Sequence, residues 1–303
     1  MRISSQQFGN RMVDTLRASN QKLSNLMMQI DSGRRILNPS DDPVGGVRLL
    51  LLERDASVLS QYRSNIGTLS IRLQQNESHL DGLLKTVVSA KDLMLRAADS
   101  STTSADLHAL AGTLESLKQT LVEGANVKDS EGNYLFSGTL TNTAPLGYDP
   151  AAPEGSRYRY NGNYEQQKVV VGHGVTQAAN SNIAGVVDLV NQLDAALTAL
   201  KAPGVSSSDP ATHALINASL GSLDSGVNTL SGQIASLGGM QNTLDLLDQS
   251  HEAMLVSNGQ AANMVGQLDY AEAYDKMSNY MVAVQGTYKV YGRVAQLSLF
   301  DIL

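Results

Sequence analysis

The sequence predicts a mainly α-helical protein, an elongated antiparallel helical bundle or coiled coil with a small inserted β subdomain. Three observations predict this class. Apolar residues recur at alternating spacings of three and four over most of the chain, which is the heptad pattern of packed helices. The composition suits narrow helix–helix contacts, because there is no Trp and only 3 Phe. Gly, Pro and Tyr with short alternating stretches interrupt the heptads within residues 129–182.

The first predicted helix covers about residues 5–32 and ends before Gly33, which suits the left-handed position after a helix. Residues 38–43 then predict a turn and a new helix start. Asp41 or Asp42 can cap the free N–H groups there, and Pro43 fits the first turn. The apolar stripe of this first helix includes Met12, Leu16, Leu23 and Ile30.

The second predicted helix is the longest, with one apolar stripe that runs across 39 residues from Leu59 to Ala97. Asn76 is its one polar member. At roughly 1.5 Å per residue the segment is about 60 Å long, which no compact globule needs. The Ser/Thr run at residues 100–104 predicts a turn, and the leucines of residues 107–121 predict a third helix that folds back as an αα-hairpin.

The middle of the chain predicts short strands. Residues 134–136 are interpreted as one strand, and residues 157–160 and 168–171, with a turn at residues 161–163, as a β-hairpin or small sheet. Helix is expected again over about residues 183–200, followed by a linker at residues 202–212.

The remaining pattern predicts two further helices. One stripe runs from Ile216 to Leu237, is interrupted at residues 238–239 by two glycines, and continues in a shifted register to Leu247. The C-terminal stripe contains Met277, Met281, Val284, Tyr288, Tyr291 and Ala295.

These elements predict five segments. An N-terminal assembly helix occupies residues 1–42 and the first half of a helical rod residues 43–128. The β subdomain occupies residues 129–182, and the second half of the rod residues 183–267. A C-terminal assembly helix occupies residues 268–303.

Composition argues against several functional classes. A net charge of −7 does not fit a nucleic-acid binder. There is no Cys, the five histidines lack metal-ligand spacing and are expected at the surface or at stripe edges, and no catalytic or cofactor motif appears. The N-terminus lacks the apolar region of a cleaved signal peptide, and no 18-residue apolar run predicts a membrane span. We therefore expect neither an enzyme nor a metal, a cofactor, a nucleic acid or a membrane partner.

Four stretches show a resemblance to a known family. The chain opens Met-Arg-Ile-Ser, residues 29–43 read QIDSGRRILNPSDDP, residues 132–138 read GNYLFSG, and residues 297–303 read LSLFDIL. Together they resemble the flagellin superfamily, and within it the hook-associated branch. The specific matches cover about residues 1–60, 126–138 and 265–303. Two departures are Val44-Gly45-Gly46 in place of an Ala-rich helix start, and Ile302 where Tyr is frequent.

The resemblance implies a structural part of the flagellum that is secreted by flagellar type III export without a cleaved signal. It implies that both terminal helices form an inner coiled-coil layer on assembly. The implied partners are another hook-associated junction protein (FlgK-like), flagellin, further copies of itself in a ring, and an export chaperone (FlgN-like). Periodicity alone also allows the terminal stripes to be satisfied inside one chain. The resemblance favours an assembly interface made of Met12, Leu16, Leu23, Ile30, Met281, Val284, Tyr288, Tyr291, Leu299 and Leu303.

The function expected from this is an adaptor that joins the hook-associated zone to the flagellin filament. A short flagellin that forms the filament itself is the alternative within the superfamily. A helical binding module unrelated to flagella is a third possibility, and an enzyme a distant fourth.

Overall fold

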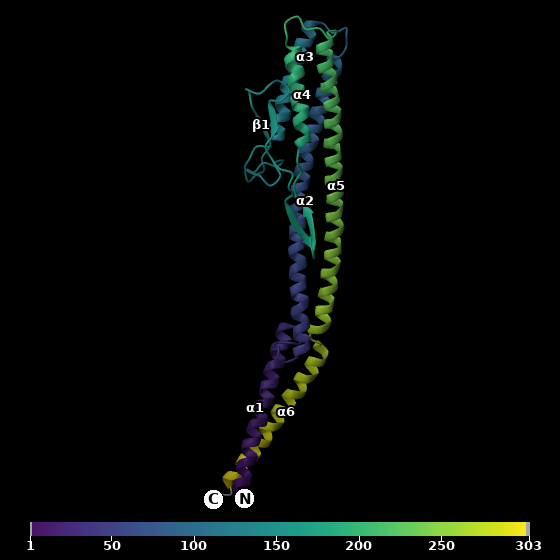
Figure 1. Cartoon of the computed structure of the whole chain (residues 1–303). Coiled ribbons are helices and arrows are strands. Elements are labelled where there is room, and N and C mark those ends of the chain that lie inside the picture. The colour runs from purple at the N-terminus through teal and green to yellow at the C-terminus, as the bar shows by residue number, and fades with distance from the viewer. Residues whose placement is uncertain (1, 301–303) are drawn as a thin grey trace. The chain divides into compact units, whose positions relative to one another are not determined.

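The computed structural model describes residues 2–300, with side chains described over residues 7–293. It divides into two compact units: unit 1 comprises Met1–Ser60 with Glu252–Leu303, and unit 2 comprises Gln61–His251. The described residues form six helices, which confirms the mainly helical class (Figure 1). These are α1 (Arg2–Ser32), α2 (Pro43–Ala97), α3 (Ser104–Ala125), α4 (Ala184–Leu200), α5 (Pro210–Gly266) and α6 (Tyr270–Phe300).

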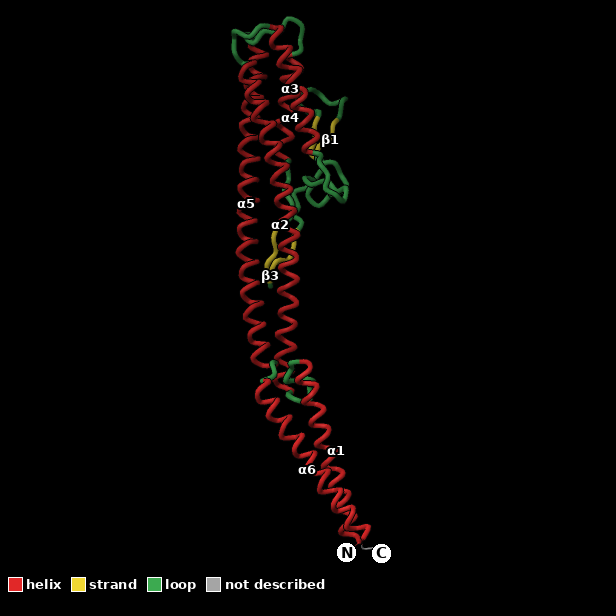
Figure 2. Tube along the Cα trace, turned by 180° about the vertical axis from the view of Figure 1, so that it is seen from behind, coloured by secondary structure: helices red, strands yellow, loops and turns green. Residues whose placement is uncertain are grey.

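Unit 2 is a helical bundle with an aliphatic core. The later part of α2 and the earlier part of α5 run side by side, and α3 and α4 pack on each other next to them (Figures 1 and 2). The stripe of α2 from Ile66 to Ala97 is buried as the heptads predict, including Asn76. Thr103 and Asp106 form a capping box at the start of α3, which satisfies N–H groups there after the turn from α2.

Helix α5 is continuous, so the predicted interruption at Gly238 and Gly239 is wrong. Each glycine inside a helix costs about 1 kcal/mol relative to alanine. Leu237 and Leu244 on either side are fully buried. Because burial of each leucine is worth roughly 1.5–3 kcal/mol, their packing outweighs the glycine penalty.

The β subdomain consists of two separate two-stranded sheets. Strand β1 (Leu146–Tyr148) pairs antiparallel with β2 (Tyr158–Tyr160), and β3 (Lys168–Gly172) pairs antiparallel with β4 (Val175–Ala178). Strands therefore form at both predicted segments, residues 157–160 and 168–171, but they lie in different sheets, so the predicted pairing of the two with each other is wrong. The predicted strand at residues 134–136 is also wrong, since only one isolated bridge, between Lys128 and Tyr134, forms there.

Side-chain amides explain this pairing. Asn126 hydrogen-bonds both main-chain groups of Leu146, at 2.9 and 3.1 Å. Asn191 of α4 does the same for Tyr158, at 2.8 and 2.9 Å. These bonds fix β1 beside α3 and β2 beside α4, and the two strands then pair with each other.

One histidine lies in the interior of unit 2, contrary to the sequence interpretation. His251 is only 7% exposed, and its Nε2 lies 2.8 Å from the carbonyl oxygen of Val171. A β-bulge at Val171 breaks the ladder between Val170 and Gly172 and turns this carbonyl outward. The histidine thereby fastens the end of the β3–β4 hairpin to α5.

Candidate assembly surface

The two terminal helices pack against each other in unit 1. Helices α1 and α6 lie side by side and antiparallel, with both chain ends at the same end of the pair (Figure 1). Their buried core is small: Leu26, Leu268 and Ala273 are less than a tenth exposed, with Ile30, Met277 and Tyr280 packed around them. A pair with so few buried residues leaves most of its apolar surface on the outside.

The predicted residues of α1 lie on its least exposed stripe. Met12, Leu16, Leu23 and Ile30 are half-buried and share that stripe with the buried Leu26. In α1, therefore, the apolar stripe predicted from the sequence is the one that packs against α6 within the same chain.

The predicted residues of α6 divide between two faces. Val284 is half-buried on the inner stripe that continues from Met277 and Tyr280. Met281, Tyr288 and Tyr291 are 42%, 54% and 42% exposed; Met281 and Tyr288 lie on the adjoining outer face, whereas Tyr291 follows Val284 at heptad spacing. Leu299 lies in α6 but its side chain is outside the described range, and Leu303 is outside the described residues altogether.

The outer face of α6 is a regular apolar stripe. Tyr274, Met281 and Tyr288 follow one another at heptad spacing. Tyr270 precedes Tyr274 by four residues, and Tyr291 follows Tyr288 by three, at the edge that the outer face shares with the inner stripe. All five side chains are between 42% and 54% exposed. Tyrosine is enriched at protein interfaces, because its ring buries apolar area while its hydroxyl keeps a polar contact. We call these five residues the outer stripe.

Exposed apolar residues are concentrated in unit 1 as a whole. Most of the large hydrophobic side chains that are exposed in the described part of the chain belong to it. They are Phe8, Met27, Met28, Val44, Val47, Leu50, Leu51, Val58, Met254, Val256, Met264, Tyr270, Tyr274, Met281, Val282, Tyr288, Val290 and Tyr291. Large exposed apolar surfaces of this kind mark interaction sites.

A clamp around Arg35 ties the N-terminal and C-terminal parts of unit 1 together. The Arg35 guanidinium donates two hydrogen bonds to the carbonyl oxygen of Val265, at 2.9 and 3.2 Å. The Arg35 main chain donates to the carbonyl of Gly266 at 2.8 Å, and Leu268 donates to Gly33 at 3.0 Å. Sequence reasoning missed this role of Arg35, because its partners lie 230 residues away.

Asp42 joins the clamp to the start of α2. Its carboxylate accepts the N–H of Gly45 at 2.9 Å and pairs with Arg35 at 2.9 Å. The Gly45 N–H, and then Arg35, hold the pKa of Asp42 below the ordinary value of 3.8. Asp42 is thus the helix cap, while Asp41 accepts the N–H groups of Leu37 and Asn38 inside the turn.

Among residues 2–300 there is no cluster of three or more His, Asp or Glu side chains placed to hold a metal ion. No described helix is long and apolar enough to cross a bilayer. The chemistry that unit 1 offers is apolar contact along helices.

Known proteins resemble this chain over most of its length. A family model described as the bacterial flagellin N-terminal helical region matches residues 3–141. Flagellar hook-associated protein 3 of Escherichia coli (strain K12) is 25% identical over 288 residues, which are 90% of each chain. The protein of the same name from Salmonella typhimurium (strain LT2) is 25% identical over 316 residues, 100% of this chain and 99% of the relative.

Solved structures agree with these sequence matches. A structure described as that of a flagellar hook-associated protein from Vibrio parahaemolyticus is 32% identical, with a TM-score of 0.67. It covers 75% of this chain and 99% of its own. Hook-associated protein 3 from Legionella pneumophila is 15% identical and shares the fold, with a TM-score of 0.65 over 71% of this chain and 98% of its own.

Proposed function

The chain belongs to the flagellin superfamily and, within it, to the flagellar hook-associated protein 3 family, and on this basis we propose that it is a structural adaptor of the bacterial flagellum. It joins the hook-associated zone to the flagellin filament. The role is mechanical and not enzymatic.

The observation that carries this proposal is the exposed apolar surface of unit 1. The outer stripe of α6 and the exposed residues at the start of α2 face solvent in the single chain. A stable monomer seldom leaves so much apolar surface uncovered, because burial is worth about 25 cal/mol per Å². Neighbouring subunits of an assembly would cover it.

The assembly role is divided between the two faces of the terminal helices. The inner stripe, which includes Met12, Leu16, Leu23, Ile30 and Val284, joins α1 to α6 in each subunit. The outer stripe, with Met281, Tyr288 and Tyr291, contacts neighbours. Residues 1–42 and 268–303 then form the inner layer of the assembly, while residues 43–267 form its helical and β outer parts.

The proposed neighbours differ along the flagellum. We place a FlgK-like hook-associated protein on one side, flagellin on the other, and further copies of this chain in a ring between them. Export through the flagellar type III channel, with a FlgN-like chaperone, is part of the same proposal. Location in the flagellum follows from the family.

A deletion strain tests the role. We expect intact hooks, flagellin shed into the medium and loss of swimming, with recovery on complementation. Normal swimming would exclude a flagellar role. Purified protein added to filament seeds separates the adaptor from the alternative of a short flagellin: an adaptor adds a limited number of subunits, and continued growth would show a filament protein.

A further inference from the structure

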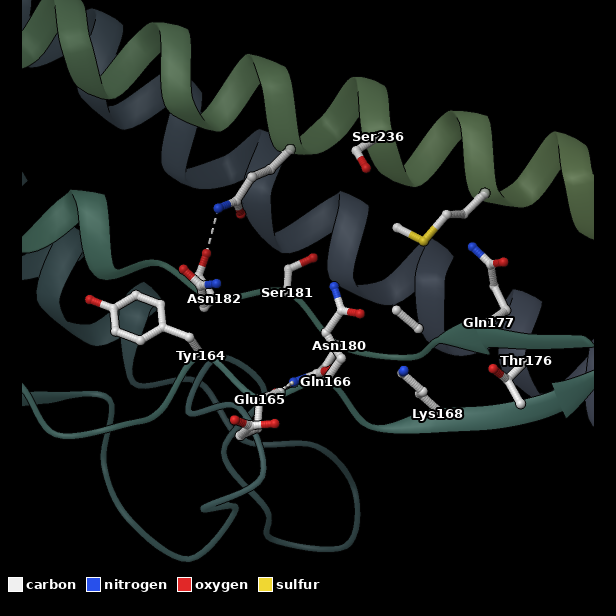
Figure 3. A pocket seen from close by; sticks show the side chains of 13 residues that line it. Tyr164, Glu165, Gln166, Lys168, Thr176, Gln177, Asn180, Ser181, Asn182 and Ser236 are labelled. Carbon is white, nitrogen blue, oxygen red and sulfur yellow. Dashed lines mark hydrogen bonds between the residues drawn. The ribbon is translucent and has the colours of Figure 1, made fainter.

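Unit 2 contains a half-open groove of about 550 Å³ between α5 and the segment that follows the β3–β4 hairpin. Residues 176–178 and 180–182 form one side, and Gln233, Ser236 and Met240 of α5 form the other. Figure 3 shows Asn180, Ser181 and Asn182 facing Ser236 across this space. The volume lies in the range of ordinary ligand sites.

The free edge of β4 lines this groove. Ala179 donates its N–H to the carbonyl of Gln167 at 2.8 Å. Gln167 and Ala179 are therefore a hydrogen-bonded pair. Such pairs alternate with non-bonded pairs along an antiparallel ladder. It follows that Thr176 and Ala178, which lie opposite Val170 and Lys168, belong to non-bonded pairs. Their N–H and C=O groups therefore point away from β3.

The other edge of the hairpin confirms this alternation. Val170 lies opposite Thr176, and its carbonyl also points out of the ladder, where the Asn65 side chain donates to it at 2.8 Å. The outer edge of β3 is thus partly satisfied by α2. Over the described residues 2–300, no hydrogen bond reaches the main-chain groups of Thr176 or Ala178.

Helix α5 already forms one bond to this side of the segment. Gln233 donates its Nε2 to the carbonyl oxygen of Asn182 at 2.5 Å. Asn182 lies four residues beyond the end of β4 and also forms an isolated bridge with Ser137, so this bond holds the segment that follows β4 beside α5. The Oε1 of Gln233 is buried and has no hydrogen-bond partner. Unsatisfied groups therefore lie on both sides of the groove.

We infer that the open edge of β4 binds an extended segment of another protein, which lies in the groove against α5 as a third strand. The free N–H and C=O groups of β4 recur at every second residue. The main chain of another extended strand has the same spacing and can hydrogen-bond to them, as in β-augmentation. A two-stranded sheet is marginally stable alone, and a third strand adds a complete ladder.

The lining defines the chemistry of the segment. The side chains around the groove are mostly amides and hydroxyls, with Glu165 and Lys168 as one charge of each sign. A segment with polar, uncharged side chains and no net charge fits best. We assign it to a different protein: each of the four described strands of this chain already pairs with a neighbour along one edge, and pairing with a second copy is the outcome that the dimer test below would reveal. The inference concerns unit 2 and does not depend on the assembly role of unit 1.

The probe is a fluorescently labelled peptide, acetyl-Thr-Gln-Thr-Val-Thr-Gln-Thr-amide, followed by polarisation against the full chain. We expect saturable, weak binding at high micromolar to millimolar concentration. Two analogues carry N-methyl groups on alternate residues, one analogue for each edge of the peptide. Methylation of the edge that faces β4 should abolish binding, while methylation of the other edge should leave it unchanged.

Two protein variants locate the site. Ser236→Trp fills the groove from the α5 side and should weaken binding by at least about tenfold, or 1.4 kcal/mol. Ala235→Trp is the matched control, since Ala235 is exposed on the same helix but does not line the groove. Ala178→Pro removes an N–H that points into the groove and leaves the β3–β4 ladder intact. It should weaken binding with no change in helix content.

Each of several results would overturn the inference. These are no saturable binding at millimolar peptide, equal loss from methylation of either edge, and equal affinity of the Ser236→Trp and Ala235→Trp proteins. Concentration-dependent dimers that Ser236→Trp abolishes, and with which the peptide does not compete, would show that a second copy occupies the edge instead.

Discussion

Replacement of Tyr288 by Asp tests the outer stripe most directly. A tyrosine buries about 150–250 Å² when fully covered, and Tyr288 is 54% exposed in the single chain. About 100 Å² thus remains for a neighbouring subunit to cover. At about 25 cal/mol per Å², this contact is worth about 2.5 kcal/mol per subunit, or about 70-fold in affinity. The unpaired carboxylate that Tyr288→Asp leaves in a buried contact adds to this loss.

The Tyr288→Asp substitution should leave the stability of the single chain unchanged. Because the Tyr288 side chain already meets water, we expect the melting temperature and helix content of the monomer to stay unchanged within error. Val284→Asp provides the contrast, since Val284 is half-buried on the stripe that faces α1. That variant should loosen the α1–α6 pair in the monomer as well, which amide hydrogen exchange of both helices would detect. Asn279→Asp is the control for the added charge. It introduces the same charge at an exposed position about 160° around the helix from Met281 of the outer stripe.

The assay combines three measurements: monomer melting, the amount of each variant secreted into the medium, and the amount retained on isolated hooks. We expect Tyr288→Asp to be secreted normally and to be lost from hooks, with swimming impaired. Asn279→Asp should behave as the parent protein. Normal retention of Tyr288→Asp on hooks would refute the assignment of the outer stripe to assembly. A large fall in the melting temperature of its monomer would refute the placement of Tyr288 on a free surface.

Three further predictions concern stability. Asn76→Leu should raise the unfolding free energy of unit 2 by about 1–2 kcal/mol, because both polar atoms of the Asn76 side chain are buried without a partner; a lower melting temperature would contradict this. In urea unfolding, Gly226→Ala should lower the stability of unit 2, since the added methyl group meets the buried Leu189 side chain. Gly232→Ala should raise it by up to about 1 kcal/mol, because nothing lies near that position. The same sign for both variants would be inconsistent with the packing. The pKa of Asp42 is lowered from 3.8, so its contribution to the stability of unit 1 is complete above that pH and is lost as the pH falls through the lowered value. Hydrogen exchange of unit 1 in the Asp42→Asn protein should lack this acid-dependent component. Equal acid sensitivity of the two proteins would argue against the cap and the ion pair.

The helices were predictable because heptad spacing reports burial directly. The apolar stripe from Ile66 to Ala97 contains so many repeats that the prediction of this helix does not depend on any single residue. Strands β2 and β3 were also predictable, because residues 157–160 and 168–171 alternate, but β1 has only three residues and almost no periodic signal, so the pairing of β1 with β2 was not predictable. Their pairing depends on the side chains of Asn126 and Asn191, which look like ordinary polar residues in the sequence.

The candidate surface was only partly predictable for a related reason. The apolar pattern of α6 is wide enough to cover two adjacent faces, and spacing cannot tell which face meets α1. Val284 and Tyr288 both fit the heptad, yet one is half-buried within the chain and the other is exposed. The contacts of Arg35 with Val265 could not be inferred at all, because nothing local in the sequence indicates a partner so far along the chain.

The Arg35 clamp has a consequence for the order of events during synthesis. The bonds from Arg35 to Val265 join residues 230 positions apart, and α1 packs against α6, which is also far along the chain. In proteins most helical stability comes from tertiary packing of an amphipathic face, so a nascent or truncated chain has an α1 without the helix that stabilises it. The long separation also makes this one of the slowest contacts to form. Unit 1 can therefore form only after residues 265–268 and α6 have been synthesised, since the clamp and the α1–α6 contact both need them.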